Sequence, residues 1–206
     1  MVYHQYTMPS PRYRRLAPQR RAHILQVARR HLAAGAEATS YNRIIVDAGI
    51  SKTTAYLYFD GKDDLVAEVW RDLLARLAEV MGPWRPAGSV PGFWRRLGTT
   101  RDALRHHLVG NPDDLALLGQ SVTVPESATF ERWFADLVED GISLGIIRTE
   151  VPRPLLVGAT IAVFRVADEH VLAAMVRGEP GDSEPGWRLM RALWGAPPAH
   201  PATSRA

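Results

Sequence analysis

Apolar residues recur at helical spacing in one segment of this chain after another. The first such segment begins near Pro18 and ends at Gly35, and its apolar face is formed by Ile24, Leu25, Ala28 and Leu32. The same spacing predicts further helices at 41–48, 52–59, 62–81, 93–109, from 111 onward, and at 127–144, 154–177 and 187–194. No segment shows the period-two alternation of a strand, so the sequence predicts an all-α protein.

The residues between and around these segments are rich in turn formers. Residues 82–92 hold several Gly and Pro residues and are typical of a connector, whereas 1–16 are polar and contain Pro9 and Pro11. The Pro- and Ala-rich tail after Gly195 is predicted to be disordered.

Charge is unevenly distributed along the 206 residues. Residues 1–52 hold nine Lys and Arg but only two acids, whereas the rest of the chain has an excess of acids, and the net charge is +3. A basic end on a mildly acidic body indicates a polyanion partner for that end, although a solvated basic tail has the same composition.

Composition excludes several classes of protein. The chain has no cysteine, which excludes a disulfide scaffold, a thiolate zinc site and a cysteine nucleophile. No apolar run is long enough to span a membrane, and the N-terminal residues lack the pattern of a secretory signal. These features predict a cytoplasmic protein with no membrane partner.

Two short helices separated by a glycine turn form the most informative stretch, residues 40–59. Ser40 and Ser51 are suitable N-caps, and Gly49 separates the two helices. This is the layout of a helix-turn-helix, whose second helix enters the DNA major groove. On the helical wheel of 52–59, the inward side holds Ile50, Ala55 and Phe59, the outward side Thr53, Thr54 and Leu57, and the flanks Tyr56 and Tyr58.

Residues 35–45 (GAEATSYNRII) and 48–65 (AGISKTTAYLYFDGKDDL) resemble the DNA-binding domain of the TetR family of transcriptional regulators. The resemblance covers about residues 18–70, and it departs from the family's usual pattern at Thr53, where glycine is common, and at Ala55, where leucine is common. The DNA-contacting residues that it implies are Tyr41, Asn42, Arg43, Lys52, Thr53, Thr54, Tyr56, Leu57, Tyr58 and Lys62.

The resemblance also implies an overall organisation. A flexible basic arm (1–16) would precede a helix-turn-helix domain (17–61), and the fourth helix would link it to a larger ligand-binding and dimerisation domain (62–195), with a disordered tail at 196–206. The expected partners are a double-stranded DNA operator, an unknown small-molecule effector and a second copy of the chain. The homodimer is expected through 154–177 and 185–195, because residues 155–167 are apolar on nearly every side of their helix.

The effector site is less specified by the sequence. Candidate ligand-binding residues are Trp94, His107, Phe130, Trp133, Phe134, Phe164 and Arg165, although aromatic residues at such spacings also form plain core. No cofactor or metal is expected, because adjacent His106 and His107 point to different faces of their helix.

Three hypotheses about the function remain open. The favoured one is a DNA-binding regulator, in which a small molecule releases a repressor from a palindromic operator. An alternative is a helix-turn-helix protein-interaction or DNA-architectural module without an effector. An enzyme using His106, His107, Glu126 or Glu131 is disfavoured, because no nucleophile–base pair, phosphate loop or metal motif is present.

Overall fold

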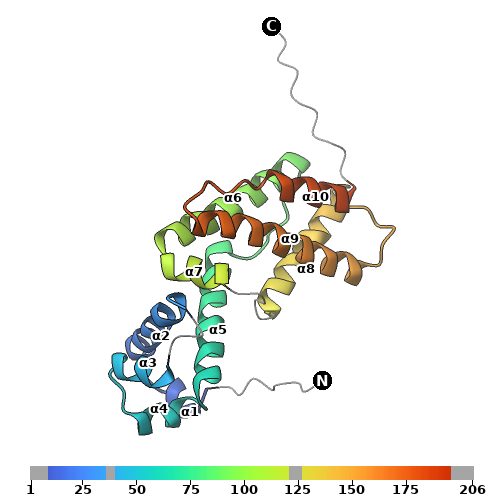
Figure 1. Ribbon diagram of the computed structural model, residues 1–206. Helices are drawn as coiled ribbons and strands as arrows, with labels where there is room; N and C mark the ends of the chain where they lie inside the picture. The colour runs from blue at the N-terminus through green and yellow to red at the C-terminus, as the bar shows by residue number, and fades with distance from the viewer. Residues whose placement is uncertain (1–8, 36–39, 121–126, 196–206) are drawn as a thin grey trace. The chain divides into compact units, whose positions relative to one another are not determined.

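A computed structural model describes residues 9–35, 40–120 and 127–195 of the chain. These residues form helices and no strand, which confirms the all-α prediction (Figure 1). The helices are α1 (Pro11–Arg14), α2 (Pro18–Ala33), α3 (Tyr41–Asp47), α4 (Lys52–Tyr58), α5 (Lys62–Met81), α6 (Val90–Gly110), α7 (Pro112–Gln120), α8 (Ala128–Ser143), α9 (Arg153–Val176) and α10 (Glu184–Trp194).

The chain divides into two compact units, Met1–Glu79 with His106–Pro125 and Val80–Arg105 with Glu126–Ala206. This division differs from the predicted boundary at residue 62. In the first unit α2 packs against both α3 and α7, and α5 buries Leu65, Val69 and Leu73. Most of α5 and the end of α6 therefore belong to the helix-turn-helix unit, because their apolar faces complete its core.

The N-terminal segment differs from the predicted flexible arm where the structure describes it. Ser10 accepts a hydrogen bond from the Tyr13 backbone N–H, Pro11 occupies the first turn, and a short helix follows. Tyr13 is only 1% exposed. Residues 1–8 and the predicted disordered tail at 196–206 lie outside the described residues.

The second unit is built on a large aromatic and aliphatic core. The fully buried side chains Phe93, Leu137 and Trp194 lie in this core, and α9 packs against both α8 and α10. The close approach of α9 and α10 depends on Gly186, where an added Cβ would lie 2.6 Å from the Cβ of Ala167. Among the described helices, none combines the length and apolar character of a membrane span.

Candidate nucleic-acid interface

The turn between α3 and α4 is held by hydrogen bonds from two sides. Gly49 has a φ of +64°, which favours glycine, and the Ile50 N–H donates to the Ile45 carbonyl over 3.0 Å. Arg20 of α2 donates a 2.7 Å hydrogen bond to the Gly49 carbonyl. These contacts fix the angle at which α4 leaves the turn.

The inward face of α4 anchors it to the first unit. Ser51 caps the helix by accepting from the Thr54 N–H over 3.1 Å. Ala55 is fully buried, Phe59 is 1% exposed, and Ile50 at the end of the turn is 9% exposed. The predicted inward side of this helix is therefore confirmed.

The outward face of α4 combines a cation, a hydroxyl and two partly apolar side chains. Lys52 and Thr53 are exposed, and Tyr56 and Leu57 are 54% and 43% exposed. Asn42 and Arg43 of the neighbouring α3 are exposed as well. We call the residues Asn42, Arg43, Lys52, Thr53, Tyr56 and Leu57 the reading face. Its donors and its positive charge suit base edges and phosphate oxygens.

Tyr41 supports this face from behind. Its ring packs edge-on against Tyr56 with 5.7 Å between ring centroids, and its hydroxyl is enclosed without a hydrogen-bond partner among the described residues. Burial, with smaller contributions from Tyr56 and Asp64, raises the pKa of Tyr41 to about 12, so its phenol stays neutral. Tyr41 therefore orients Tyr56 in this arrangement, and its hydroxyl does not point to solvent.

Three other predicted contact residues are half-buried, and of these only Thr54 differs from the outward position that the helical wheel gave it. Thr54 is half-buried, and its hydroxyl lies 2.8 Å from the Ser51 hydroxyl, so it belongs to the helix cap. Tyr58 is half-buried against Tyr13, with ring centroids 6.1 Å apart. Lys62 is also half-buried, at the start of α5.

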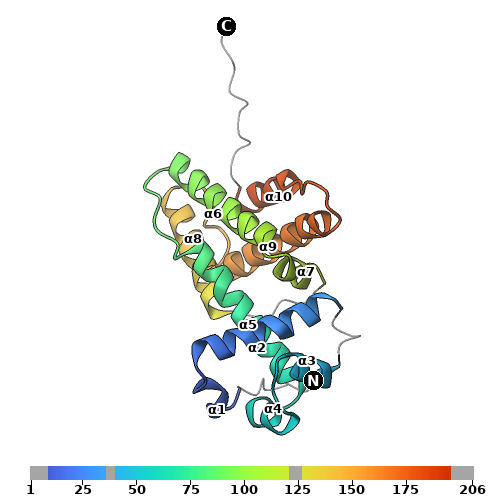
Figure 2. The same ribbon diagram turned by 90° about the vertical axis from the view of Figure 1, so that its left-hand side faces the viewer.

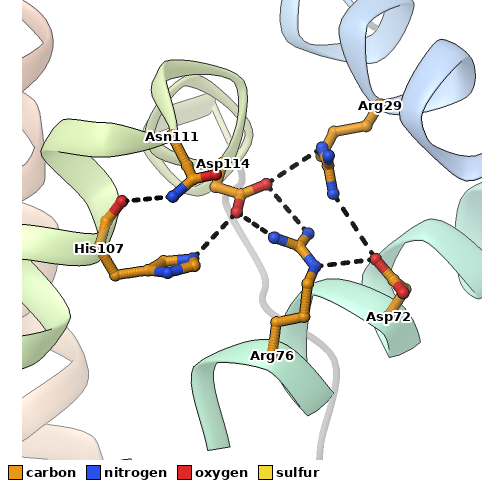
Figure 3. Close-up of polar contacts among 6 residues, drawn as sticks. All are labelled: Arg29, Asp72, Arg76, His107, Asn111 and Asp114. Carbon is orange, nitrogen blue, oxygen red and sulfur yellow. Dashed lines mark hydrogen bonds and ion pairs between the residues drawn. The ribbon is translucent and has the colours of Figure 1, made fainter. Parts of the chain in front are cut away.

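A buried charge cluster joins residues of α2, α5, α6 and α7 in the first unit (Figure 3). Asp114 of α7 is fully buried, and both of its oxygens accept hydrogen bonds from Arg76 of α5. The Arg29 Nε lies 3.3 Å from one oxygen, and the His107 Nε2 lies 3.2 Å from the other. Asp72 pairs with the same two arginines, at 3.0 Å from Arg76 and 3.6 Å from Arg29.

The cluster determines the charge state of Asp114. Burial alone would raise the pKa of its carboxyl, but the hydrogen bonds and charge of Arg76, with the charge of Arg29 and the hydrogen bond from His107, hold that pKa below its ordinary value. Asp114 is therefore ionised at neutral pH, and it joins α2, which carries Arg29, to α5, α6 and α7.

The predicted ligand-binding residues are not all brought together. His107 belongs to the Asp114 cluster of the first unit, whereas the other predicted ligand-binding residues lie in the second unit. In the second unit Trp133 is buried, and Trp94, Phe134 and Phe164 pack on the same core. Phe130 is half-buried and Arg165 is exposed. Over the described residues, no group of three or more His, Asp or Glu side chains is placed to hold a metal ion.

A helix-turn-helix with an exposed basic and hydroxyl-bearing face defines a helical DNA-binding protein. Residues 24–69 match the family described as bacterial regulatory proteins, tetR family. The fold also matches the crystal structure of a TetR family transcriptional regulator from Chloroflexus aurantiacus. The TM-score is 0.51 and the identity 22%, over 92% of this chain and 94% of that one. No curated protein matches the sequence.

These matches confirm the resemblance to the TetR family, whose DNA-binding segment lies at residues 24–69 of this chain. The chain is accordingly a DNA-binding transcriptional regulator.

Proposed function

We propose that the protein is a dimeric repressor whose reading face binds a palindromic operator and which a small molecule releases. The observation that carries the DNA-binding step is the exposure of Lys52, Thr53 and Tyr56 on a helix whose opposite side is anchored by Ala55 and Phe59. A helix held from behind in this way can enter the major groove without disturbing its own core.

Exchange of Thr53 for alanine is expected to relax base preference. Thr53 is the exposed threonine of α4, so its hydroxyl and methyl groups are available to a base edge, and a good base contact is worth about 1–3 kcal/mol. Affinity for the preferred operator should fall by about 10- to 100-fold, while affinity for unrelated duplex DNA stays close to that of wild type. Fluorescence anisotropy on matched operator and scrambled duplexes measures both affinities.

Lys52→Ala is the matched comparison on the same helix. An ammonium group that contacts phosphate should contribute equally to the binding of every sequence. This variant should therefore weaken binding to operator and scrambled duplexes alike. The slope of log affinity against log salt concentration (the salt slope) should fall by about 1 per protomer. If Thr53→Ala and Lys52→Ala both leave operator affinity unchanged, the reading face is wrongly assigned.

The dimer proposal is supported by an uncovered apolar stripe on α9 and α10. Exposed apolar or small residues of α9 recur at helical spacing, and they are Leu155 (63% exposed), Gly158, Ala162, Val166 (54%), Ala173 and Val176 (54%). The exposed charged residue Glu169 interrupts them. On the neighbouring α10 Leu189 is 55% exposed. We call these exposed positions of α9 and α10 the apolar stripe. A second copy of the same stripe, related by a two-fold axis, would cover it.

The effector proposal rests on the aromatic side chains of the second unit. The ring centroid of Phe164 lies 5.1 Å from that of Phe134 and 5.9 Å from that of Trp187. All three side chains are half-buried rather than buried. Half-buried rings of this kind suit a flat apolar molecule that inserts beside them. Quenching of tryptophan fluorescence during a screen of apolar aromatic compounds would test this proposal.

Release from DNA requires that the effector favour one conformation of the protein over another. Helices α5 and α6 each contain residues of both units, at 62–81 and 90–110. We propose that an effector in the second unit acts on the reading face through these two continuous helices. An effector that binds tightly but equally to both conformations would leave operator affinity unchanged.

One observation favours the alternative of a DNA-binding module without an effector. The rings of Trp133, Trp84, Phe93 and Trp194 contact one another in that order at centroid distances of 5.2–6.0 Å, as in a filled core. A thermal-shift screen in which no compound stabilises the protein, while operator binding is intact, would support this alternative.

A further inference from the structure

The N-terminal helix α1 belongs to the first unit and packs against α4 (Figure 2). Ser10 donates two hydrogen bonds to carbonyls in the last turn of α4, from its hydroxyl to Leu57 over 2.5 Å and from its N–H to Tyr58 over 3.0 Å. The last carbonyls of a helix have no partner within it, so Ser10 satisfies groups that α4 leaves open. The backbone of residue 10 is thereby attached to the C-terminal end of α4.

Tyr13 fixes the attachment through packing. Its side chain is 1% exposed, and its ring lies 4.7 Å from the ring of Phe59, the residue that anchors α4 from behind. At the C-terminal end of α1, Arg21 of α2 donates a hydrogen bond to the Arg14 carbonyl over 3.3 Å. Both ends of α1 are therefore held, and the helix moves with the helix-turn-helix.

The rest of this short segment is strongly basic and faces solvent. Arg12, Arg14 and Arg15 are all exposed, and no carboxylate lies within ion-pair distance of them in the described part of the chain. Arg12 and Arg14 of α1 and Arg15 at its C-cap, which lack counter-charges among the described residues, form a surface for a polyanion. Arginine binds phosphate oxygens in a fixed, two-pronged geometry.

We propose that α1 is a second DNA-contacting element, in which Arg12, Arg14 and Arg15 bind backbone phosphates beside the groove that α4 enters. This inference rests on the proposed operator binding by the reading face. Because α1 is tied to the last turn of α4, its three guanidinium groups are presented at a constant offset from the bases that α4 contacts. They supply affinity and register but no base preference.

The test compares the 206-residue chain with a variant that carries Arg12→Ala, Arg14→Ala and Arg15→Ala, on the duplex that the wild type selects. Each phosphate contact contributes about 0.9 to the slope of log affinity against log salt, so the slope should fall by about 2–3 per protomer. Operator affinity at physiological salt should fall by about 10- to 100-fold, and the selected consensus sequence should stay the same. A hydroxyl-radical footprint should lose protection only at backbone positions flanking the α4 site.

A matched control removes the same charge elsewhere. Arg95, Arg105 and Arg132 are exposed and lie outside the helix-turn-helix, so their triple alanine variant should keep the wild-type salt slope. Replacing the three α1 arginines with lysine should restore most of the slope, since lysine retains the charge. Tyr13→Ala should lower the slope although all arginines remain, whereas Tyr13→Phe should not, because the buried Tyr13 hydroxyl has no partner among the described residues.

The outcomes separate this inference from the function on which it rests. If the wild type binds a selected operator but the alanine variant keeps its salt slope and footprint, α1 does not contact DNA and the inference alone is overturned. An equal loss of slope in the control triple variant would also overturn it, because net charge would then explain the effect. If the wild type selects no duplex at all, both the operator proposal and this inference are wrong.

Discussion

Replacement of Asp114 by asparagine is expected to lower the free energy of unfolding by about 3 kcal/mol. Asp114 is fully buried and accepts from Arg76 through both oxygens, with Arg29 3.3 Å away. A neutral amide would leave two partly buried guanidinium groups with Asp72 as their remaining counter-charge. That residual pairing places the expected loss at the lower end for a broken buried ion pair. Urea unfolding followed by circular dichroism measures it.

The same variant should change the dependence of stability on pH. The pKa of Asp114 is lower in the folded protein than in the unfolded chain, where it is about 3.9. Its contribution to stability is therefore fully present above about pH 5 and is lost as the pH falls through the unfolded value towards the folded one. The stability difference between wild type and Asp114→Asn should accordingly shrink as the pH is lowered below about 4.

Asp113→Asn is the matched control for this prediction. Asp113 lies beside Asp114 in the first turn of α7, and it forms no ion pair with any residue that the structure describes. Its replacement removes the same charge from the same helix end and should cost less than about 1 kcal/mol. Equal destabilisation by the two variants would mean that the helix dipole, rather than the buried cluster, accounts for the effect.

A charged substitution in the apolar stripe should have the largest effect on DNA binding. Leu189→Asp places a carboxylate within the proposed dimer contact, where burial without a partner is costly. Light scattering should show the mass fall from twice 22.9 kDa to 22.9 kDa. Operator affinity should fall by at least about 100-fold, because one protomer then engages a single half-site.

Val90→Asp provides the comparison for that substitution. Val90 is 43% exposed in the same unit but lies at the start of α6, outside the apolar stripe. Its variant should stay dimeric and keep operator affinity. A wild-type mass near 22.9 kDa at the concentrations at which the protein binds its operator would refute the dimer proposal.

The local pattern of the sequence was sufficient to predict most helices and the anchoring of α4. Ile50, Ala55 and Phe59 are buried as their spacing predicts, because a short capped helix has only one side to pack against its neighbours. The same wheel was wrong for Thr54, which it placed outward, because a wheel does not contain the local contact between the Thr54 and Ser51 hydroxyls. Tyr58 is half-buried as its flank position predicts, but its contact with Tyr13 joins segments that are distant in the sequence.

Two features depended on contacts between distant segments. The Asp114 cluster joins residues 29, 72, 76, 107 and 114, and no local pattern of the sequence brings these positions together. Helix α1 had a local signal that could have been recognised, since Ser10 and Pro11 form an N-cap followed by a first-turn proline. The polar composition and the two prolines favoured an arm instead.

The decisive measurement is sequencing of the DNA fragments that the purified 206-residue chain selects from random duplexes. A two-fold dimer that contacts DNA through α4 should enrich an inverted repeat whose half-site centres lie about 10 base pairs apart, or a multiple of that spacing. The preference at one position of each half-site should be lost when the selection is repeated with Thr53→Ala. Selection of no sequence by the wild type, or an identical consensus for the two proteins, would contradict this prediction.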